Sequence, residues 1–450
     1  MTHDKVTLVL FSVIGLALSM ALSGCSTSHL TALAPISSIT GKGGIVIADE
    51  PHAVLAATEI LNGGGNAADA AVTLAFTLAV TYQSAAGIGG GGICLVYDST
   101  SSQASVLDFY PQPSTTRKLS SVLEVAIPAL PRGLFALHSK SGKKPWQSLV
   151  IPAENLARFG FPVSKAFADT LTYHSSQLMK DPVGLGSFSS KRRVLLGEGE
   201  LYKQLDLSNV LGRIRSRSAR DFYSGSLAAE VVKSAQESEA SLQVSDLNGY
   251  APRWTDLQTI KVSNFDFYAA YNQMDIKLLA NMINGEKNSE LDTRFSSPSS
   301  TGFIVADRSS NVVACTLTML EPFGAGALLS NYGFLLAPSP TRANGKVPPL
   351  LSVIATMGDP KRVIFAASSG GYGAPSRMGI LFRKAVLNSQ PLAQSYPVNN
   401  LAASEKGPTA HTPSVNAFLC RNGLSSNLFG CSVSSDPNSF GYSLVTNGGY

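Results

Sequence analysis

The stretch STGFIVADRSSNVVACTLT, residues 300–318, contains two apolar runs on either side of a polar turn. Residues 302–306 and 312–318 alternate and are rich in β-branched side chains, and residues 308–311 carry turn signals, so the sequence predicts a β-hairpin. Before it lies a loop or linker, residues 285–300, rich in Ser, Asn, Glu and Lys. The linker ends in the hydroxyl cluster Ser299-Ser300-Thr301, a composition that is by itself typical of a loop.

The region before the linker is mostly helical. Asn66, followed three residues later by Asp69, forms a capping arrangement that predicts a helix from 67 to about 80. The other predicted elements before the linker are strands at 44–48, 93–97 and 106–109 and helices at 52–61, 146–158 and 219–235.

The chain thus divides into a helix-rich half that contains one hairpin and a strand-rich half, which includes a further predicted strand at 363–367. Apolar sheets need covering on their outer faces. We therefore expect an α+β fold in which two stacked sheets lie between helical layers.

The glycine cluster at 87–92 contains a G-x-G-x-x-G match at Gly87, Gly89 and Gly92. A dinucleotide-binding turn needs these glycines after a strand and before a helix. Here a predicted helix precedes them and a strand follows, so the order argues against nucleotide binding. Close approach of backbone segments is the better interpretation, because glycine has no Cβ.

Bulk composition excludes several partner classes. The 450 residues include 44% hydrophobic and 14% charged side chains, and the net charge of +5 is dispersed. The densest basic stretches, 191–193 and 213–220, are not interleaved with aromatic residues, so we expect no nucleic-acid partner. The six histidines are scattered and no Cys/His spacing is typical of a metal site, so we expect neither a metal nor a cofactor.

The N-terminus carries export signals. Lys5 precedes the apolar run 6–22, and Leu22-Ser23-Gly24-Cys25 ends it with small residues before a cysteine. This tetrapeptide resembles the bacterial lipobox, which predicts a lipoprotein signal peptide at 1–25, a lipidated Cys25 and a tether at 26–42. Ser26 resembles the outer-membrane sorting preference. The expected location is the periplasmic side of the cell envelope; an uncleaved membrane anchor is the alternative.

Four further cysteines follow, and an exported chain can form disulfides. Cys420 and Cys431 flank a short polar loop and are a plausible pair. Cys94 and Cys315 lie in apolar strand-like runs, where we expect buried free thiols.

Several strings resemble the γ-glutamyltranspeptidase family. The most specific are AATEILNGGGNAADA (56–70), AGIGGGGICLVY (86–97) and GKKPWQSLVIPAENLARFGFPV (142–163), and further similarity covers 301–324 and 365–371. The resemblance implies the four-layer αββα fold of N-terminal-nucleophile hydrolases and a precursor that cuts itself. It implies a large-subunit-like half, 43–299, a small-subunit-like half, 300–450, and association of the two processed halves.

The same resemblance implies site residues. The family pattern T-x-H-Φ-S-V places the nucleophile at Ser300, with Thr301 as an off-by-one alternative. Thr318 corresponds to a second threonine that hydrogen-bonds the nucleophile. Gly370 and Gly371 correspond to glycines whose amides stabilise the oxyanion.

The family's substrate anchors are mostly replaced. The arginine that grips the substrate carboxylate corresponds to Tyr110, which cannot form a bidentate charge pair. An asparagine corresponds to Leu320, the stretch with the acidic residue reads 335–338 without a carboxylate, and of a serine pair only Ser352 remains. Two hypotheses stay open: an envelope amide hydrolase or acyltransferase for a small γ-glutamyl or less charged acyl substrate, or a non-catalytic lipoprotein that binds or acts as a scaffold.

Overall fold

A computed structural model describes residues 43–115, 123–179, 186–189, 194–255, 257–271, 276–286, 299–341, 349–371, 373–397, 413–425, 427–437 and 439–447. These residues belong to one unit, 40–448. The expected signal peptide, Cys25 and the tether lie outside the described residues. The polar linker is described only at its two ends.

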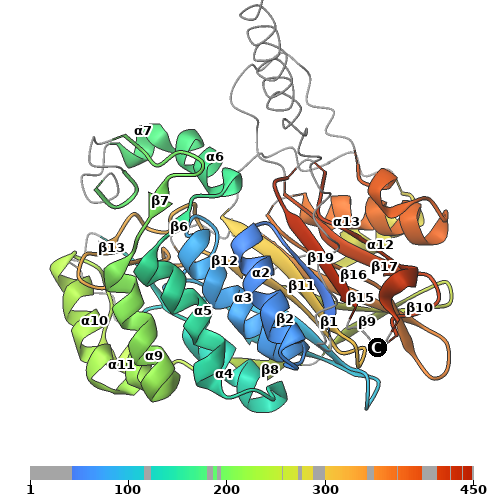
Figure 1. Cartoon of the computed structure of the whole chain (residues 1–450), viewed down its shortest axis with the longest axis horizontal. Helices are drawn as coiled ribbons and strands as arrows, with labels where there is room; N and C mark the ends of the chain where they lie inside the picture. The colour runs from blue at the N-terminus through green and yellow to red at the C-terminus, as the bar shows by residue number, and fades with distance from the viewer. Residues whose placement is uncertain are drawn as a thin grey trace, which may run out of the picture. The chain divides into compact units, whose positions relative to one another are not determined.

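The first sheet has seven strands in the order β19-β1-β11-β12-β2-β3-β8 (Figure 1). Its centre is the predicted hairpin, whose register runs from Ser300 opposite Thr318 to Ala306 opposite Val312. The strand β11 begins at Ser300, two residues before the predicted start. The strands of this sheet are β1 (Gly43–Ala48), β2 (Gly91–Asp98), β3 (Gln103–Phe109), β8 (Arg253–Thr255), β11 (Ser300–Asp307), β12 (Val312–Thr318) and β19 (Tyr442–Asn447).

The second sheet has six strands in the order β18-β17-β16-β15-β10-β9. It draws two strands from before the linker and four from after it, and the first sheet is mixed in the same way. The two halves of the sequence are therefore interleaved in both sheets. The strands are β9 (Gln258–Val262), β10 (Phe265–Tyr271), β15 (Leu350–Met357), β16 (Arg362–Gly370), β17 (Asn416–Cys420) and β18 (Cys431–Ser434).

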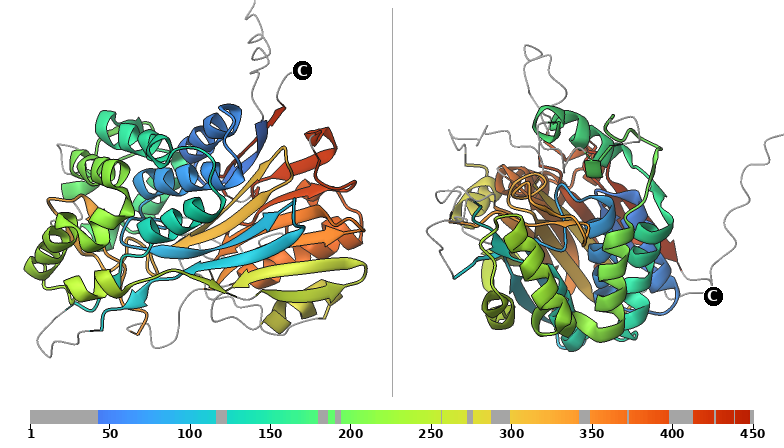
Figure 2. Two further views of the ribbon diagram at one scale, coloured as in Figure 1. Left: turned by 90° about the horizontal axis from the view of Figure 1, so that it is seen from below. Right: turned by 90° about the vertical axis from the view of Figure 1, so that its left-hand side faces the viewer.

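Three apolar cores separate four layers, and the left view of Figure 2 shows the sheets between helices. One core joins the first sheet to helices, a second fills the space between the sheets, and a third joins the second sheet to helices. The αββα architecture is confirmed. The main helices are α2 (Pro51–Asn62), α3 (Ala67–Thr81), α4 (Leu130–Ser141), α5 (Trp146–Phe159), α6 (Lys165–Tyr173), α9 (Leu205–Ser224), α10 (Ser226–Glu237), α11 (Val244–Gly249), α12 (Ile276–Asn284) and α13 (Ala374–Phe382).

The predicted start of one helix is confirmed, and another helix prediction is wrong. The side chains of Asn66 and Asp69 form the expected capping box at the start of α3. The single helix predicted at 219–235 is wrong, because α9 ends at Ser224 and α10 starts at Ser226. The residue between them, Gly225, is extended, and a Cβ there would lie 2.2 Å from the Asp221 carboxylate.

The disulfides correct one expectation. Cys94 and Cys315 are not free thiols: they form a disulfide, because β2 and β12 are neighbouring strands that place them directly opposite each other. A separation of 221 residues hid this pairing from the sequence. A second disulfide joins Cys420 and Cys431, the pair suggested by their short loop.

The glycine cluster lies where backbones nearly touch. A Cβ on Gly89 would meet the Leu335 carbonyl oxygen at 2.1 Å, and one on Gly90 would meet the Thr318 carbonyl oxygen at 2.3 Å. These glycines therefore allow close packing beside the end of β12, as the sequence indicated. Among the helices described here, none has the length and hydropathy needed to cross a membrane.

Candidate active site

A chain of hydrogen bonds runs through the hydroxyl of Thr318 at the end of the central hairpin. The Ser300 hydroxyl donates to Thr318 Oγ1 at 2.9 Å, and Thr318 Oγ1 donates to the carbonyl oxygen of Ser299 at 3.0 Å. The Leu320 amide donates to the same Thr318 oxygen at 2.8 Å, which fixes the rotamer of this side chain. Both hydroxyl-bearing residues are buried.

The carbonyl that precedes Ser300 is held by two donors. Besides Thr318 Oγ1, the Met319 amide donates to the Ser299 oxygen at 2.9 Å. Two donors on one carbonyl oxygen polarise the C=O bond and can stabilise a negative charge on that oxygen. The bond between Ser299 and Ser300 therefore lies beside the Ser300 hydroxyl and has two hydrogen-bond donors on its carbonyl oxygen.

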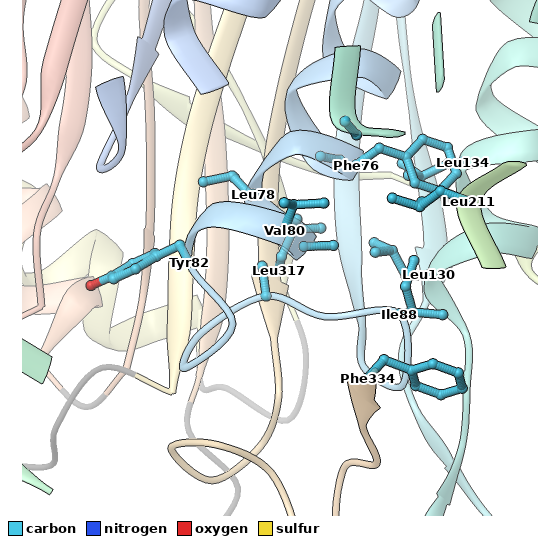
Figure 3. Packing of buried hydrophobic residues seen from close by; sticks show 14 of the residues in the cluster. Phe76, Leu78, Val80, Tyr82, Ile88, Leu130, Leu134, Leu211, Leu317 and Phe334 are labelled. Atoms are coloured by element: carbon cyan, nitrogen blue, oxygen red, sulfur yellow. The ribbon is translucent and has the colours of Figure 1, made fainter. Parts of the chain in front are cut away.

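Strand alternation decides which hydroxyl faces this site. Leu317 packs into the helix-side core near Leu78 and Val80 of α3 (Figure 3), so its neighbour Thr318 faces the other sheet. Thr301 points to the opposite side of β11 from Ser300, and its hydroxyl donates to Asp49 at 2.7 Å. The geometry therefore brings Ser300, and not Thr301, to Thr318.

The glycine pair has two different environments. A Cβ on Gly370 would lie 2.5 Å from Ser300 Cβ, so only glycine lets β16 approach the candidate nucleophile this closely. The Gly371 amide instead donates to the Pro349 carbonyl at 2.8 Å. The Gly371 N–H therefore already has a backbone partner just beyond the ends of β15 and β16, and its expected oxyanion role stays a prediction.

Ser352 is the remaining serine of the pair that the resemblance assigns to substrate binding. Its side chain is fully buried between the sheets, where its hydroxyl bonds Ser368 at 3.0 Å and Thr316 at 3.2 Å. Thr316 lies beside Gly370, so Ser352 contacts the site only indirectly, through the Thr316 hydroxyl. It does not present a free hydroxyl to a substrate carboxylate, because the neighbouring strands supply its partners.

Sequence reasoning missed a buried carboxyl group at the end of β1. Asp49 accepts hydrogen bonds from Thr301, from Ser414 at 2.7 Å and from Asn416 at 2.9 Å. Burial raises the pKa of Asp49, these hydrogen bonds oppose the rise, and the charge of Asp436 adds to it. No local pattern marks this residue, since its burial depends on β1, β11 and β17 meeting in space.

The comparisons with known proteins decide the family. The γ-glutamyltranspeptidase family model matches residues 53–293, more than half of the chain. The chain belongs to the γ-glutamyltranspeptidase family. The matched segment ends before Ser300, so the interpretation of Ser300 as a candidate nucleophile rests on the hairpin geometry and the sequence pattern and not on this match.

Individual relatives agree with the family match. The glutathione hydrolase proenzyme of Pseudomonas aeruginosa is 31% identical over 273 residues, which cover 57% of this chain and 46% of that enzyme. The glutathione hydrolase proenzyme of Bacillus subtilis strain 168 is 28% identical over 251 residues, which cover 50% of this chain and 41% of that enzyme. The chain thus spans less than half the length of these curated relatives.

A solved structure extends the likeness to the whole fold. The cephalosporin acylase from Bacillus halodurans superposes with a TM-score of 0.72 at 17% identity, covering 90% of this chain and 96% of that one. At this identity the match shows the fold alone. The family's αββα arrangement is therefore present although the chain is short.

Three positions that the sequence resemblance assigns to substrate anchors, at Tyr110, Leu320 and Ala337, lie in one apolar cluster. Tyr110 packs against Leu320, Ala126 and Ala337. The first sheet connects it to the site: Thr318 lies opposite Gly91, and continuing the register of β2 and β3 places Tyr110 beside Gly91. Three strand spacings separate Tyr110 from Ser300, about 14 Å. The side chains in this cluster thus include no charged group.

Proposed function

We propose that this protein is an amide hydrolase or acyltransferase of the N-terminal-nucleophile type that cuts its own chain between Ser299 and Ser300. The observation that carries the proposal is the hydrogen-bond chain from Ser300 Oγ through Thr318 Oγ1 to the Ser299 carbonyl oxygen. This geometry joins the attacking hydroxyl to the oxygen on which charge develops. The family relationship supports the same chemistry.

The proposed self-cleavage begins with an acyl shift. Ser300 Oγ attacks the carbonyl carbon of Ser299; its proton passes to Thr318 Oγ1, and the Thr318 proton moves to the Ser299 oxygen. The tetrahedral intermediate then collapses, the C–N bond breaks, and the Ser300 nitrogen takes a proton. Water hydrolyses the resulting ester, which leaves a carboxyl group on Ser299 and a free α-amine on Ser300.

That α-amine completes the site for an external amide. It can accept the proton of its own hydroxyl as Ser300 Oγ attacks the substrate carbonyl, and then deliver that proton to the leaving amine. The acyl group is carried on Ser300 as an ester. Water releases it in hydrolysis, and an amine releases it in acyl transfer.

The proposed substrate is an amide whose acyl group carries less charge than a γ-glutamyl group. An α-carboxylate or α-ammonium placed against Tyr110, Leu320 and Ala337 would lose its water without gaining a charged partner from these side chains. Desolvating a charge without a partner costs several kcal/mol. We therefore expect weak action on glutathione.

Intact mass and N-terminal sequencing of the reduced, denatured protein test this proposal. We expect two chains, the smaller beginning at Ser300, and a single uncut chain for Ser300→Ala. Thr301→Val is the matched control, because it removes the neighbouring hydroxyl and should still give the Ser300 terminus. In the wild type, a smaller chain that begins at Thr301 instead of Ser300 would make Thr301 the nucleophile.

A second candidate function is a non-catalytic family member that binds a ligand or acts as an envelope scaffold. The apolar cluster at Tyr110 and the occupied Gly371 amide favour it. An uncut chain in both the wild type and Ser300→Ala would exclude self-cleavage and make this function the better one.

We also propose that the protein is a periplasmic lipoprotein anchored to the outer membrane through Cys25. The two disulfides support an exported location, because such bonds persist mainly in oxidising compartments. Mass analysis of the N-terminal peptide from the membrane fraction should show a lipid on Cys25. Release of a Cys25→Ala variant from that fraction would agree with it.

A further inference from the structure

A buried polar network lies on the opposite side of β11 from the candidate nucleophile. Its centre is Asp49, which directly follows β1 and is 6% exposed. One carboxylate oxygen accepts from Thr301 at 2.7 Å, and the other accepts from Ser414 and from Asn416 at 2.7 and 2.9 Å. Three donors on two oxygens fill most of the hydrogen-bonding capacity of a carboxylate.

The network holds β11 by backbone as well as by side chain. The side-chain amide of Asn416, which binds Asp49, also donates to the Gly302 carbonyl oxygen at 2.7 Å. Asn416 opens β17 in the second sheet, whereas Gly302 lies in β11 of the first sheet and Asp49 directly follows β1 of that sheet. The network thus joins the two sheets at the end of β11 where Ser300 lies.

The orientations of neighbouring side chains along a strand are coupled through the backbone. Thr301 directly follows Ser300 and points to the opposite face, so a backbone rotation that moved Thr301 would also turn Ser300. The bond from Ser300 Oγ to Thr318 Oγ1 depends on that orientation. A misplacement of about 1 Å at a reacting group can cost about 100-fold in rate.

We infer that Asp49 is a positioning residue for the Ser299–Ser300 bond, acting through Thr301 and through Asn416. The inference rests on the proposed self-cleavage. Asp49 does not touch the reacting atoms: it holds the two residues after Ser300 so that the Ser300 hydroxyl meets Thr318.

The charged surroundings of Asp49 predict how this role responds to pH. The charge of Asp436, which is paired with Arg377 at 2.6 Å, adds to the rise in the pKa of Asp49. Burial and the charges of Asp49 and Glu50 raise the pKa of Tyr82. Burial raises the pKa of Asp49 above the usual 3.8. The carboxyl group should therefore take up a proton at a higher pH than an exposed aspartate as the solution is acidified. Protonation removes an acceptor, so self-cleavage should slow as pH falls through this raised pKa.

The test compares self-cleavage rates of freshly made full-length chains by intact mass. Thr301→Val removes the donor to Asp49 while keeping the side-chain shape, and we expect cleavage about 10- to 100-fold slower, the worth of a hydrogen bond to a charged group. Thr301→Ser keeps the donor and should cleave within a few-fold of wild type. Asp49→Asn should slow cleavage and remove the loss of rate at acid pH.

Asp307→Asn is the matched control, because Asp307 is a buried carboxylate at the other end of the same strand and caps α3. It should lower the melting temperature without changing the cleavage rate of the folded protein. Equal slowing by Asp49→Asn and Asp307→Asn, in proportion to their melting temperatures, would overturn the inference. Wild-type cleavage by Thr301→Val would overturn it as well.

Hydrogen exchange separates this inference from the proposed function. In the Ser300→Ala chain, which does not need to cleave, adding Asp49→Asn should speed amide exchange across residues 299–303 and leave 312–318 protected. Unchanged exchange in both segments would contradict the positioning role even if the wild type cleaves. Conversely, an uncut wild type with faster exchange in the variant would refute only self-cleavage.

Discussion

Two neighbouring regions at the same end of the first sheet differ in chemistry. In the first region, the hydroxyl groups of Ser300 and Thr318 and the carbonyl oxygen of Ser299 are joined by hydrogen bonds. In the second region, Tyr110 packs against Leu320, two residues after Thr318, in an apolar cluster at positions where the resemblance implies charged or amide anchors. The hydroxyl network at Ser300 is thus present, while the side chains at the expected anchor positions are uncharged.

Removing the Thr318 hydroxyl should have the largest effect on the rate of self-cleavage, because it disrupts the polar region. Thr318→Val leaves the Ser299 carbonyl with only the Met319 amide and leaves Ser300 without its partner. Loss of one oxyanion donor typically costs about 100- to 1,000-fold in rate. We expect self-cleavage to slow by that factor. Intact mass recorded over time measures the rate. Thr318→Ser, which keeps the hydroxyl, should cleave at close to the wild-type rate; equal loss in both variants would show that shape rather than the hydroxyl matters.

Adding a charged side chain to the apolar region should change substrate preference, with a smaller effect than the loss of the Thr318 hydroxyl has on self-cleavage. The double variant Tyr110→Arg with Leu320→Asn offers a guanidinium and an amide to a substrate α-carboxylate. We expect the ratio of γ-glutamyl anilide to hexanoyl anilide hydrolysis to rise about tenfold, the worth of a hydrogen bond to a charged group. The ratio of kcat/KM values measures it. The Leu320 amide that binds Thr318 is a backbone group and is kept in this variant, so self-cleavage should stay within a few-fold of the wild-type rate. A larger fall would show that the two regions are coupled.

A carboxylate outside both regions should show the smallest effect, on stability alone. Asp246 accepts from Ser114, Thr115 and the Gln243 amide; burial raises its pKa, but these bonds outweigh burial and leave the pKa lowered. A lowered pKa stabilises the fold above the unfolded value and loses this contribution as pH falls through the folded value. Asp246→Asn should therefore cost about 1 kcal/mol near neutral pH and less in acid. Urea unfolding at both pH values measures it, and an equal cost at both would contradict the shifted pKa.

Local signals account for much of what could be predicted. The alternation at 300–318 gave the hairpin, and Asn66 with Asp69 marked the start of α3, because both patterns involve residues close in the chain. The resemblance to the family led to Ser300 and Thr318, which the hairpin register then places opposite each other. Periodicity and capping therefore sufficed wherever the deciding contacts are short in sequence.

The rest depends on contacts between distant segments. The disulfide partners Cys94 and Cys315, the burial of Asp49 and the internal position of Ser352 all follow from which strands become neighbours. Likewise, the Gly371 amide donates to the Pro349 carbonyl oxygen just beyond the ends of β16 and β15. Strand order across two interleaved sheets is not written in any local pattern, so these features could be seen only in three dimensions.

The Cys94–Cys315 disulfide gives the proposed cut an unusual product. A break before Ser300 would put the two cysteines on separate polypeptides, so the fragments would remain one covalent molecule that dilution cannot separate. Denatured without reductant, the processed protein would migrate as a single species and gain only the mass of one water. If the fragments unfold, the tether keeps them at high effective concentration, so that reassembly becomes an intramolecular reaction.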